Sequence, residues 1–200
     1  KFLHYMPQIA IITSIEFDYA DIYEDLDAIK QSFLKLVEIM PEDGCIVACF
    51  DDPVVREVVS TAKCPVMTYG TNAESNWALT NLKVSPNGTF FNVMHNGTHH
   101  STYKSPMSGR HNALNALSVI AVLDRLGLEA ETVTEALGTF EGVRRRQEVR
   151  GVVNDITVID DFAHHPTAVR ETLAALKQAY SDHRLIAVFE PRTNSSRRQI

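Results

Sequence analysis

Acidic and imidazole side chains cluster in the stretch DDFAHHPT, residues 160–167, between an apolar run and a helix-like segment. At this spacing they could transfer protons, hold a metal ion or contact a nucleotide. Pro166 favours the first turn of a helix, so His164 and His165 are expected beside free amide groups and the positive end of a helix dipole. That position suits a phosphorylated or carboxylated ligand. Two alternatives stay open. The side chains only cap and solvate the turn, or they bind metal as in phosphoesterases, where an acid rather than Ala163 directly precedes the histidine pair.

Amide and imidazole groups recur at helical spacing in SGRHNALNAL, residues 108–117. His111 and Asn115 stand four residues apart and therefore share one face of a helix, with Asn112 beside them. A carboxamide can pair a donor and an acceptor with the edge of a purine, so these residues are candidates for holding adenine. The alternative is that Ser108 caps the helix and that the asparagines face solvent or bond to the local backbone.

Charged groups that suit phosphate or magnesium occur in two further stretches. The arginine triplet at residues 144–146 offers guanidinium forks for phosphate oxygens, although a solvated run of charge is the alternative. In IEFDYADIY, residues 15–23, Asp18 and Asp21 could hold Mg²⁺ or merely cap a helix. The chain contains no G-x-x-x-x-G-K-[ST] phosphate loop. An ATP-dependent enzyme would therefore need that loop from outside this sequence.

Alternating strands and helices must position these groups. Apolar residues 8–15 predict a strand buried on both faces, and residues 26–40 show the apolar spacing of an amphipathic helix. The next elements are a strand at 45–50, a helix with Asp52 as N-cap and Pro53 at its first position, and a strand at 65–70. This strand–helix repetition predicts a parallel sheet with right-handed crossovers.

The pattern then changes to shorter alternating strands. Between Trp77 and Tyr103 these strands surround an Asn96-Gly97 turn, which predicts an antiparallel patch appended to the parallel sheet. Two helices follow, at residues 109–127, closed by Gly127, and at residues 130–140. The predicted fold class is therefore α/β.

A second unit begins near residue 150. Its predicted elements are a strand at 156–160, a helix at 166–180 and a strand at 185–189. Parallel pairing would bring DDFAHHPT and the EPRTN stretch after the last strand to one rim, where open α/β sheets bind ligands. We divide the chain into residues 1–150 and 151–200, and the second part has too few strands to be stable alone.

The composition excludes several classes of protein. The 200 residues are 44% hydrophobic, enough for a core, and 25 acids against 19 bases give a net charge of −6, which disfavours nucleic-acid binding. The apolar runs are too short to span a membrane. Cys45, Cys49 and Cys64 form no C-x-x-C pair and suit reduced cytoplasmic thiols. The first residue is not Met, and we expect both ends to be cut from a longer protein.

Four motifs occur in an order that resembles the Mur ligases, bacterial ATP-dependent enzymes that form amide bonds in peptidoglycan precursors and so serve cell-wall biogenesis, cell shape and cell division. They are SGRHNALNAL, FEGVRRRQEVRG, VIDDFAHHPTAV and FEPRTNSSR. The resemblance covers essentially the whole chain. EPRTN and the stretches KFLHYMP and EFDYADIYEDLDAIKQSF are most similar to the branch that attaches a tripeptide during cell-wall recycling. The branch that adds L-alanine shares GRHNALNA and HHPT and is the runner-up.

The resemblance implies the central ATP-binding domain at residues 1–150, without its N-terminal phosphate-loop part, and the beginning of a Rossmann-like C-terminal domain at residues 151–200. It also implies ATP and Mg²⁺ as cofactors and a cytoplasmic location. The implied site residues are His111, Asn112 and Asn115 for adenine, Arg146 for the ATP phosphates, Asp161 for ribose, His164 beside it, and Arg192 and Asn194 for the incoming tripeptide.

Two positions depart from the family pattern. Tyr19 stands where relatives have a histidine that contacts a second Mg²⁺, and a protonated phenol is a poor ligand for a cation. Phe33 stands where several relatives have a carbamylated lysine, so no carbamate is expected.

The implied reaction activates the lactyl carboxylate of UDP-N-acetylmuramate as an acyl phosphate. The amine of L-Ala-γ-D-Glu-meso-diaminopimelate, or of L-alanine in the runner-up, then attacks it. A non-catalytic nucleotide-binding module is the alternative from another class. We expect the 200 residues alone to lack ligase activity.

Overall fold

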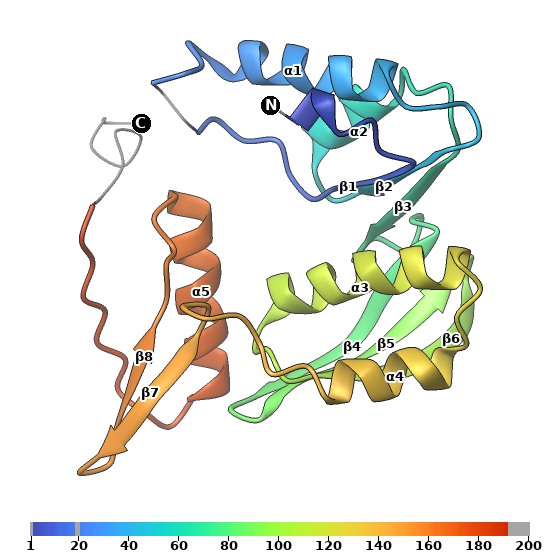
Figure 1. Ribbon diagram of the computed structural model, residues 1–200. Coiled ribbons are helices and arrows are strands. Elements are labelled where there is room, and N and C mark those ends of the chain that lie inside the picture. Colours follow the sequence, from blue (N-terminus) through green and yellow to red (C-terminus); the bar gives the residue numbers. More distant parts are fainter. Residues whose placement is uncertain (1, 19–20, 192–200) are drawn as a thin grey trace.

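The computed structural model describes residues 2–18 and 21–191. The described strands form a six-stranded sheet in the order β1-β2-β3-β4-β5-β6 and a separate two-stranded sheet, β7-β8 (Figure 1). The strands are β1 Ile9–Ile12, β2 Cys45–Cys49, β3 Val66–Gly70, β4 Trp77–Ser85, β5 Gly88–His95, β6 Thr98–Ser105, β7 Glu148–Val153 and β8 Ile156–Asp160. The helices are the short 3-10 turn η1 Phe2–His4 and α1 Leu26–Glu38, α2 Pro53–Val59, α3 Arg110–Arg125, α4 Ala130–Gly138 and α5 Pro166–Ala179. The predicted α/β class is confirmed.

The parallel strands separate two hydrophobic layers. Along β2, Ile46 and Ala48 pack in the layer of α1 and α2, whereas Val47 and Cys49 pack in the layer of α3. β1, β2 and β3 pair in parallel, as predicted. β3 also pairs in parallel with β4, which the sequence did not predict. In β1, however, Ile11 is 40% exposed. The prediction of burial on both faces is wrong for this edge strand, because α3 packs over β2 to β6 and β1 lies beyond it.

Capping chemistry fixes the ends of the first two helices. Asp25 accepts a hydrogen bond from the backbone N–H of Ala28 and caps α1. Asp52 caps α2, with Pro53 in the first turn, as the sequence predicts. The carboxylate of Asp52 also accepts a hydrogen bond from the backbone N–H of Ile15 at 3.1 Å, which holds the segment after β1.

The antiparallel part of the large sheet is the predicted patch. β4, β5 and β6 pair antiparallel, and the turn between β5 and β6 uses Asn96 at φ 49° and Gly97 at φ 79°. Positive φ at both positions is the requirement of a tight hairpin turn. α3 covers one face of these strands, and α4 packs on β6. The patch therefore supplies the platform on which α3 lies.

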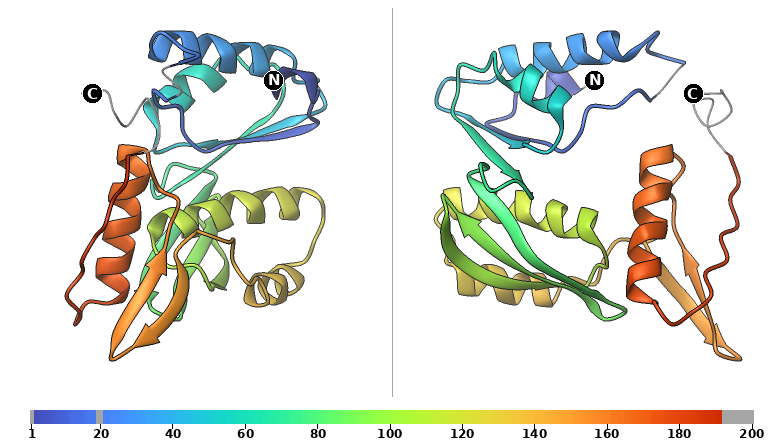
Figure 2. Two further views of the ribbon diagram at one scale, coloured as in Figure 1. Left: turned by 60° about the vertical axis from the view of Figure 1, so that its left-hand side comes forward. Right: turned by 180° about the vertical axis from the view of Figure 1, so that it is seen from behind.

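The second unit is built around α5. This helix lies between the two-stranded sheet and the larger sheet (Figure 2), and it contacts α3 and β4. β8 and α5 are confirmed predictions. β7 was not predicted; it pairs antiparallel with β8 through a turn in which Asn154 and Asp155 have positive φ. The proposed division between residues 150 and 151 falls inside β7.

The predicted strand at residues 185–189 is wrong. The segment has no regular structure, and it pairs with neither β7 nor β8. Ile186 is 71% exposed and Val188 97% exposed. A parallel strand needs a packed layer on each face, and the described residues of this unit provide only α5. The parallel pairing expected to bring EPRTN beside DDFAHHPT is therefore not observed.

Two predictions about the whole chain can be compared with the structure. Cys45, Cys49 and Cys64 are buried free thiols, as expected, and burial raises the pKa of the first two. Across residues 2–18 and 21–191, none of the helices combines the length and hydropathy that a membrane span requires.

Candidate active site

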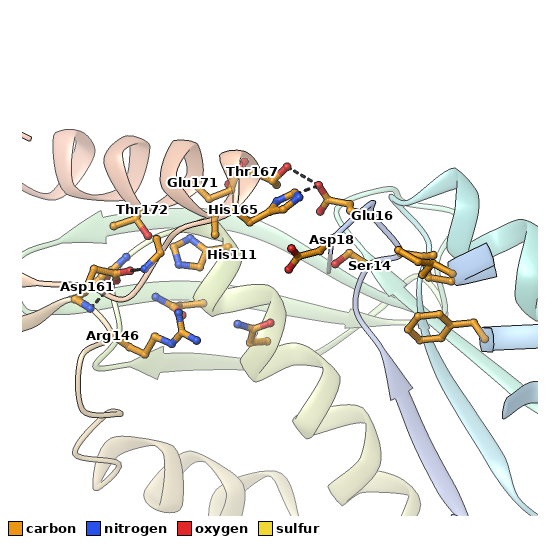
Figure 3. Close-up of a pocket in the computed structure, with 18 of the residues that line it drawn as sticks. Ser14, Glu16, Asp18, His111, Arg146, Asp161, His165, Thr167, Glu171 and Thr172 are labelled. Atoms are coloured by element: carbon orange, nitrogen blue, oxygen red, sulfur yellow. Dashed lines mark hydrogen bonds and ion pairs between the residues drawn. The ribbon is translucent and has the colours of Figure 1, made fainter. Parts of the chain in front are cut away.

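A cleft of about 1120 Å³ opens where three parts of the chain meet. One wall is the segment after β1 together with α1, and the second is the first two turns of α3 (Figure 3). The third is formed by the segment before β7, the turn after β8 and the start of α5. His111, Asn112, Asn115, Arg146 and Asp161, the five residues predicted to contact nucleotide, all line it. Sequence positions far apart thus meet at one site, as the prediction requires.

The start of α3 is shaped by its contact with α5. Gly109 is the N-cap residue, with φ 101° and no side-chain cap. Its backbone N–H donates to the hydroxyl of Thr89 at 3.0 Å. Ser108, the alternative cap, instead donates its hydroxyl to the carbonyl of Ser85 at 2.9 Å, so the capping interpretation is wrong. A Cβ atom added at Gly109 would lie 2.3 Å from the Cβ of Ala175, so α3 begins in close contact with α5. The residues that follow Gly109 on α3 face the cleft.

The three predicted adenine contacts have different local partners. The Asn112 amide donates to the carbonyl of Ser108 at 2.8 Å, as the local-backbone alternative predicts for this residue. Among the described residues, the Asn115 side chain has no hydrogen-bond partner. The Nδ1 atom of His111 is buried without a partner. Burial lowers the pKa of His111 against the opposing charges of Glu171 and Asp161, so the neutral ring is favoured.

Asp161 joins two segments of the third wall. Its carboxylate accepts hydrogen bonds from the backbone N–H groups of Ala163, at 2.7 Å, and Gln147, at 2.9 Å. The first bond is the turn-capping role left open for this stretch, but the residue also faces the cleft. The Gln147 side-chain amide is buried and makes no hydrogen bond. Arg145 and Gln147 both have positive φ, so the backbone is strained on each side of Arg146.

The arginine triplet is not a uniform solvated run. The Arg145 guanidinium lies 3.5 Å from Asp160 and 5.0 Å from the ring centre of Phe162. Arg146 lies 6.0 Å from the same ring centre and lines the cleft. A cation–π contact fixes the orientation of a guanidinium group without neutralising its charge. Arg146 therefore remains available to an anion.

The two histidines of DDFAHHPT have separate roles. His164 does not line the cleft; its Nδ1 lies 3.0 Å from the carbonyl of Phe162. His165 does line it, and its Nε2 lies 3.1 Å from the carbonyl of Phe17. The hydroxyl of Thr167 donates to the carboxylate of Glu16 (Figure 3). These contacts join the start of α5 to the segment after β1, and nothing in the local sequence pattern predicted them.

The acidic residues offer limited metal ligation. Asp18 lines the cleft, whereas Asp21 is exposed and does not. Tyr19 lies outside the described residues, as do Arg192 and Asn194. Within the described part of the chain, no three histidine, cysteine or acidic side chains are grouped closely enough to hold a metal ion. Mg²⁺ usually needs only one or two carboxylates beside water and phosphate oxygens, so Asp18 fits a nucleotide-bound ion better than a protein cage.

The donor set fits a nucleotide. Buried polar atoms normally have partners, and leaving one without a partner costs about 1–3 kcal/mol. Here the His111 ring and the Gln147 amide lack partners at the cleft. A bound purine or ribose could supply both donors and acceptors to them. Arg146 adds positive charge for phosphate at the same wall.

Comparisons with known proteins agree with this geometry. Residues 2–123 match the family model described as Mur ligase middle domain, and residues 144–200 match Mur ligase, glutamate ligase domain. A UDP-N-acetylmuramate–L-alanine ligase of Salinibacter ruber is 43% identical over 190 residues, which are 95% of this chain and 40% of that protein. One of Caldanaerobacter subterraneus is 39% identical over 98% of this chain and 42% of that protein. This chain thus spans about two fifths of these relatives.

Solved structures give the same result. The UDP-N-acetylmuramate-alanine ligase of Thermotoga maritima superposes with a TM-score of 0.75 at 30% identity, covering 90% of this chain and 40% of that one. A murein peptide ligase of Psychrobacter arcticus superposes with a TM-score of 0.66 at 36% identity, covering 96% of this chain and 39% of that one. The chain therefore belongs to the Mur ligase family of ATP-dependent, amide-bond-forming ligases.

Proposed function

We propose that the protein containing this chain joins the lactyl carboxylate of UDP-N-acetylmuramate to the amino group of an L-alanine residue at the expense of ATP. The supporting observation is the single cleft lined by His111, Asn115, Arg146 and Asp161. Two of these residues lie on α3 and two lie on the wall beside α5. A site divided in this way can close over its ligand.

In this proposal each residue contacts a different part of ATP. His111, Asn112 and Asn115 hold the adenine, Arg146 holds the phosphates, and Asp161 accepts hydrogen bonds from ribose. Support comes from the partnerless His111 ring and from the unneutralised guanidinium. ATP would supply the phosphoryl group that activates the carboxylate as an acyl phosphate, and Mg²⁺ near Asp18 would balance phosphate charge.

The chain's own residues orient the reactants and exclude water. His165 and Thr167 hold the start of α5 against the segment after β1. A closed cleft keeps water from the activated carboxylate, which would otherwise be hydrolysed. We propose two domains, as the sequence suggested. The expected division between residues 150 and 151 falls inside β7, so we place the hinge between the domains upstream, between α4 and β7. The buried free thiols support a cytoplasmic location.

Free L-alanine is the acceptor that we put first, because both curated relatives named above are L-alanine ligases. This reverses the order expected from the motifs. The tripeptide L-Ala-γ-D-Glu-meso-diaminopimelate is the second candidate. It is favoured by the EPRTN stretch, in which Arg192 and Asn194 would face the peptide, and by the 36% identity to a murein peptide ligase. Both acceptors present the amino group of L-alanine, so the same cleft chemistry serves either.

The test is an assay of the full-length gene product with ATP, Mg²⁺ and UDP-N-acetylmuramate, offering L-alanine or the tripeptide in parallel. We expect release of phosphate and a product whose mass equals the sum of the two substrates minus water. The acceptor with the larger kcat/KM decides between the two candidates. ATP binding without product from either acceptor would instead indicate the non-catalytic nucleotide-binding module.

A further inference from the structure

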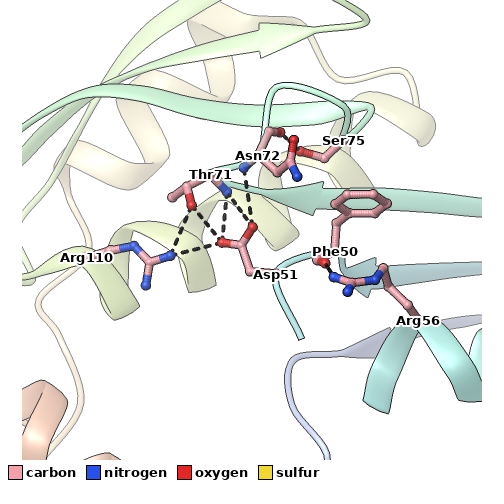
Figure 4. A network of polar contacts seen from close by, with 7 residues as sticks. All are labelled: Phe50, Asp51, Arg56, Thr71, Asn72, Ser75 and Arg110. Carbon is pink, nitrogen blue, oxygen red and sulfur yellow. Dashed lines mark hydrogen bonds and ion pairs between the residues drawn. The ribbon is translucent and has the colours of Figure 1, made fainter. Parts of the chain in front are cut away.

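A polar network outside the cleft connects β2 with the first residue of α3 (Figure 4). One Nη2 atom of Arg110 donates to the carboxylate of Asp51 at 3.0 Å and to the hydroxyl of Thr71 at 3.1 Å. The same carboxylate accepts the backbone N–H and the hydroxyl of Thr71, each at 2.9 Å, and the backbone N–H of Asn72 at 3.3 Å. Asp51, two residues after the end of β2, is therefore bonded both to the segment after β3 and to the start of α3.

The Asp51 carboxylate lies in space that is free only because residue 70 has no side chain. A Cβ atom at Gly70, the last residue of β3, would lie 2.6 Å from the Oδ1 atom of Asp51. That separation is too short for any real contact, so the bonds of Asp51 require glycine there. Neither Asp51 nor Arg110 lines the cleft. Their effect on a ligand in the cleft would therefore pass through the residues that do line it.

The network is placed where it can set the width of the cleft. Asp51 ties β2 to Arg110, and His111 and Asn112 follow Arg110 directly on α3. The neighbouring Asp52 accepts a hydrogen bond from the backbone N–H of Ile15, which lines the opposite wall. Two consecutive carboxylates between β2 and α2 thus link the two walls of the cleft.

We propose that Asp51 and Arg110 are positioning residues that align the adenine-holding turn of α3 with the wall that follows β1. The proposal rests on the proposed function of the cleft. The ion pair is partly exposed, with 46% of the Arg110 side chain and 22% of the Asp51 side chain accessible, and such pairs add little to stability. A displacement of about 1 Å at a reacting site can cost on the order of a hundredfold in rate. Nucleotide use should therefore be more sensitive to this pair than unfolding is.

The test compares variants of the full-length protein. Asp51→Asn and Arg110→Gln each remove the charge from one side of the pair, and Arg110→Lys keeps the charge but loses the guanidinium fork. We expect the KM for ATP to rise about tenfold in the first two variants and by less in Arg110→Lys, with the KM for UDP-N-acetylmuramate nearly unchanged. The double variant should have a KM for ATP no higher than that of either single variant, because each substitution breaks the same ion pair.

The matched control is Glu57→Gln. It breaks the ion pair between Glu57 and Lys30, at 2.6 Å, which joins α1 to α2 and leaves α3 untouched. We expect this variant to keep the wild-type KM for ATP. A merely structural role would lower the midpoint of thermal unfolding and leave the KM for ATP at the level of the control. That outcome overturns the proposal.

Failure of the proposed ligase function can be distinguished from failure of the positioning role. Equilibrium titration with ATP measures nucleotide affinity whether or not an amide product forms. Wild-type protein that binds ATP but makes no product would sink the ligase proposal, while about tenfold weaker binding by Asp51→Asn would still support positioning. Equal ATP affinity in wild type, Asp51→Asn and Arg110→Gln would overturn the positioning role even in an active ligase.

Discussion

A methyl group at Gly109 should separate α3 from α5 and open the cleft. A Cβ atom at this position would lie 2.3 Å from the Cβ of Ala175, a buried residue of α5. Ordinary carbon contacts begin at about 3.5 Å, so the helices would have to move apart by about 1.2 Å. Gly109 also has φ 101° and ψ 159°, a region that only glycine occupies readily. Gly109→Ala therefore combines backbone strain with a steric clash.

The two contributions can be estimated separately. Strain in this backbone region costs about 1–3 kcal/mol. Overpacking against Ala175 adds about 1–3 kcal/mol. In an Ala175→Gly background the nearest contact becomes the Ala175 Cα, at 3.4 Å, so most of the second contribution should disappear. The double-mutant cycle should therefore show a favourable coupling of about 1–3 kcal/mol between the two substitutions.

The measurements are urea unfolding and ATP titration of the full-length protein. Gly127→Ala is the control, because Gly127 has φ 80° but nothing within 4 Å of an added Cβ. We expect the control to lose about 1–2 kcal/mol through strain alone and to keep its ATP affinity. Gly109→Ala should lose more stability and bind ATP at least tenfold more weakly. Adding Ala175→Gly to Gly109→Ala should restore part of the stability and part of the ATP affinity.

The reasoning would be refuted by a Gly109→Ala protein that binds ATP as tightly as the control. It would also be refuted if Ala175→Gly restored nothing, because the clash with α5 is the part of the effect specific to this site. Either result would mean that the approach of α3 to α5 does not determine the shape of the cleft.

Three further predictions concern single side chains. Asn115→Ala should weaken ATP binding about tenfold without changing the midpoint of thermal unfolding, since its amide has no partner among the described residues. Because the pKa of His111 is lowered in the folded protein, its ring takes up a proton below about pH 6.5 in the unfolded chain but stays neutral there in the folded one. Stability should therefore fall as the pH drops from 6.5 toward the lowered pKa, and urea titrations should show a smaller fall in His111→Gln. Burial raises the pKa of Tyr103 from 10.0 to about 12, so the unfolded chain loses the phenol proton first and stability falls as the pH rises through that interval. Tyr103→Phe should move alkaline unfolding, followed by circular dichroism, to higher pH.

Features with a local physical cause were predictable from the sequence. Asp52 and Pro53 predict the start of α2, and the Asn96-Gly97 pair predicts the hairpin, because capping and positive φ depend on adjacent residues. The placement of His111 and Asn115 on one face follows from helical spacing alone. That these residues would meet Asp161 followed from the family resemblance rather than from any local pattern.

Features that depend on distant partners were missed. β7 has no apolar run and becomes a strand only because β8 pairs with it. Residues 185–189 have the composition of a strand, yet no neighbouring strand pairs with them. Ser108 has the chemistry of a cap, but the close packing of α3 on α5 places Gly109 there instead. In each case tertiary context overrode a local preference.

Some departures from local rules lie at or beside the cleft, while others, such as the positive φ of Met6 and the partnerless Trp77 and Tyr103 side chains, lie elsewhere. Residues 145 and 147 adopt positive φ although neither is glycine, and the His111 ring and Gln147 amide are buried without partners. Each departure costs stability, and a protein keeps such strain where the surrounding structure holds it for a purpose. Arg146 lies between the two strained residues and faces the same space as the partnerless groups. A ligand that satisfies those groups and neutralises Arg146 would offset both costs at once, as a nucleotide would. At equal free concentration, ATP should therefore raise the midpoint of thermal unfolding more than inorganic phosphate does, because phosphate can address only the arginine and should bind more weakly.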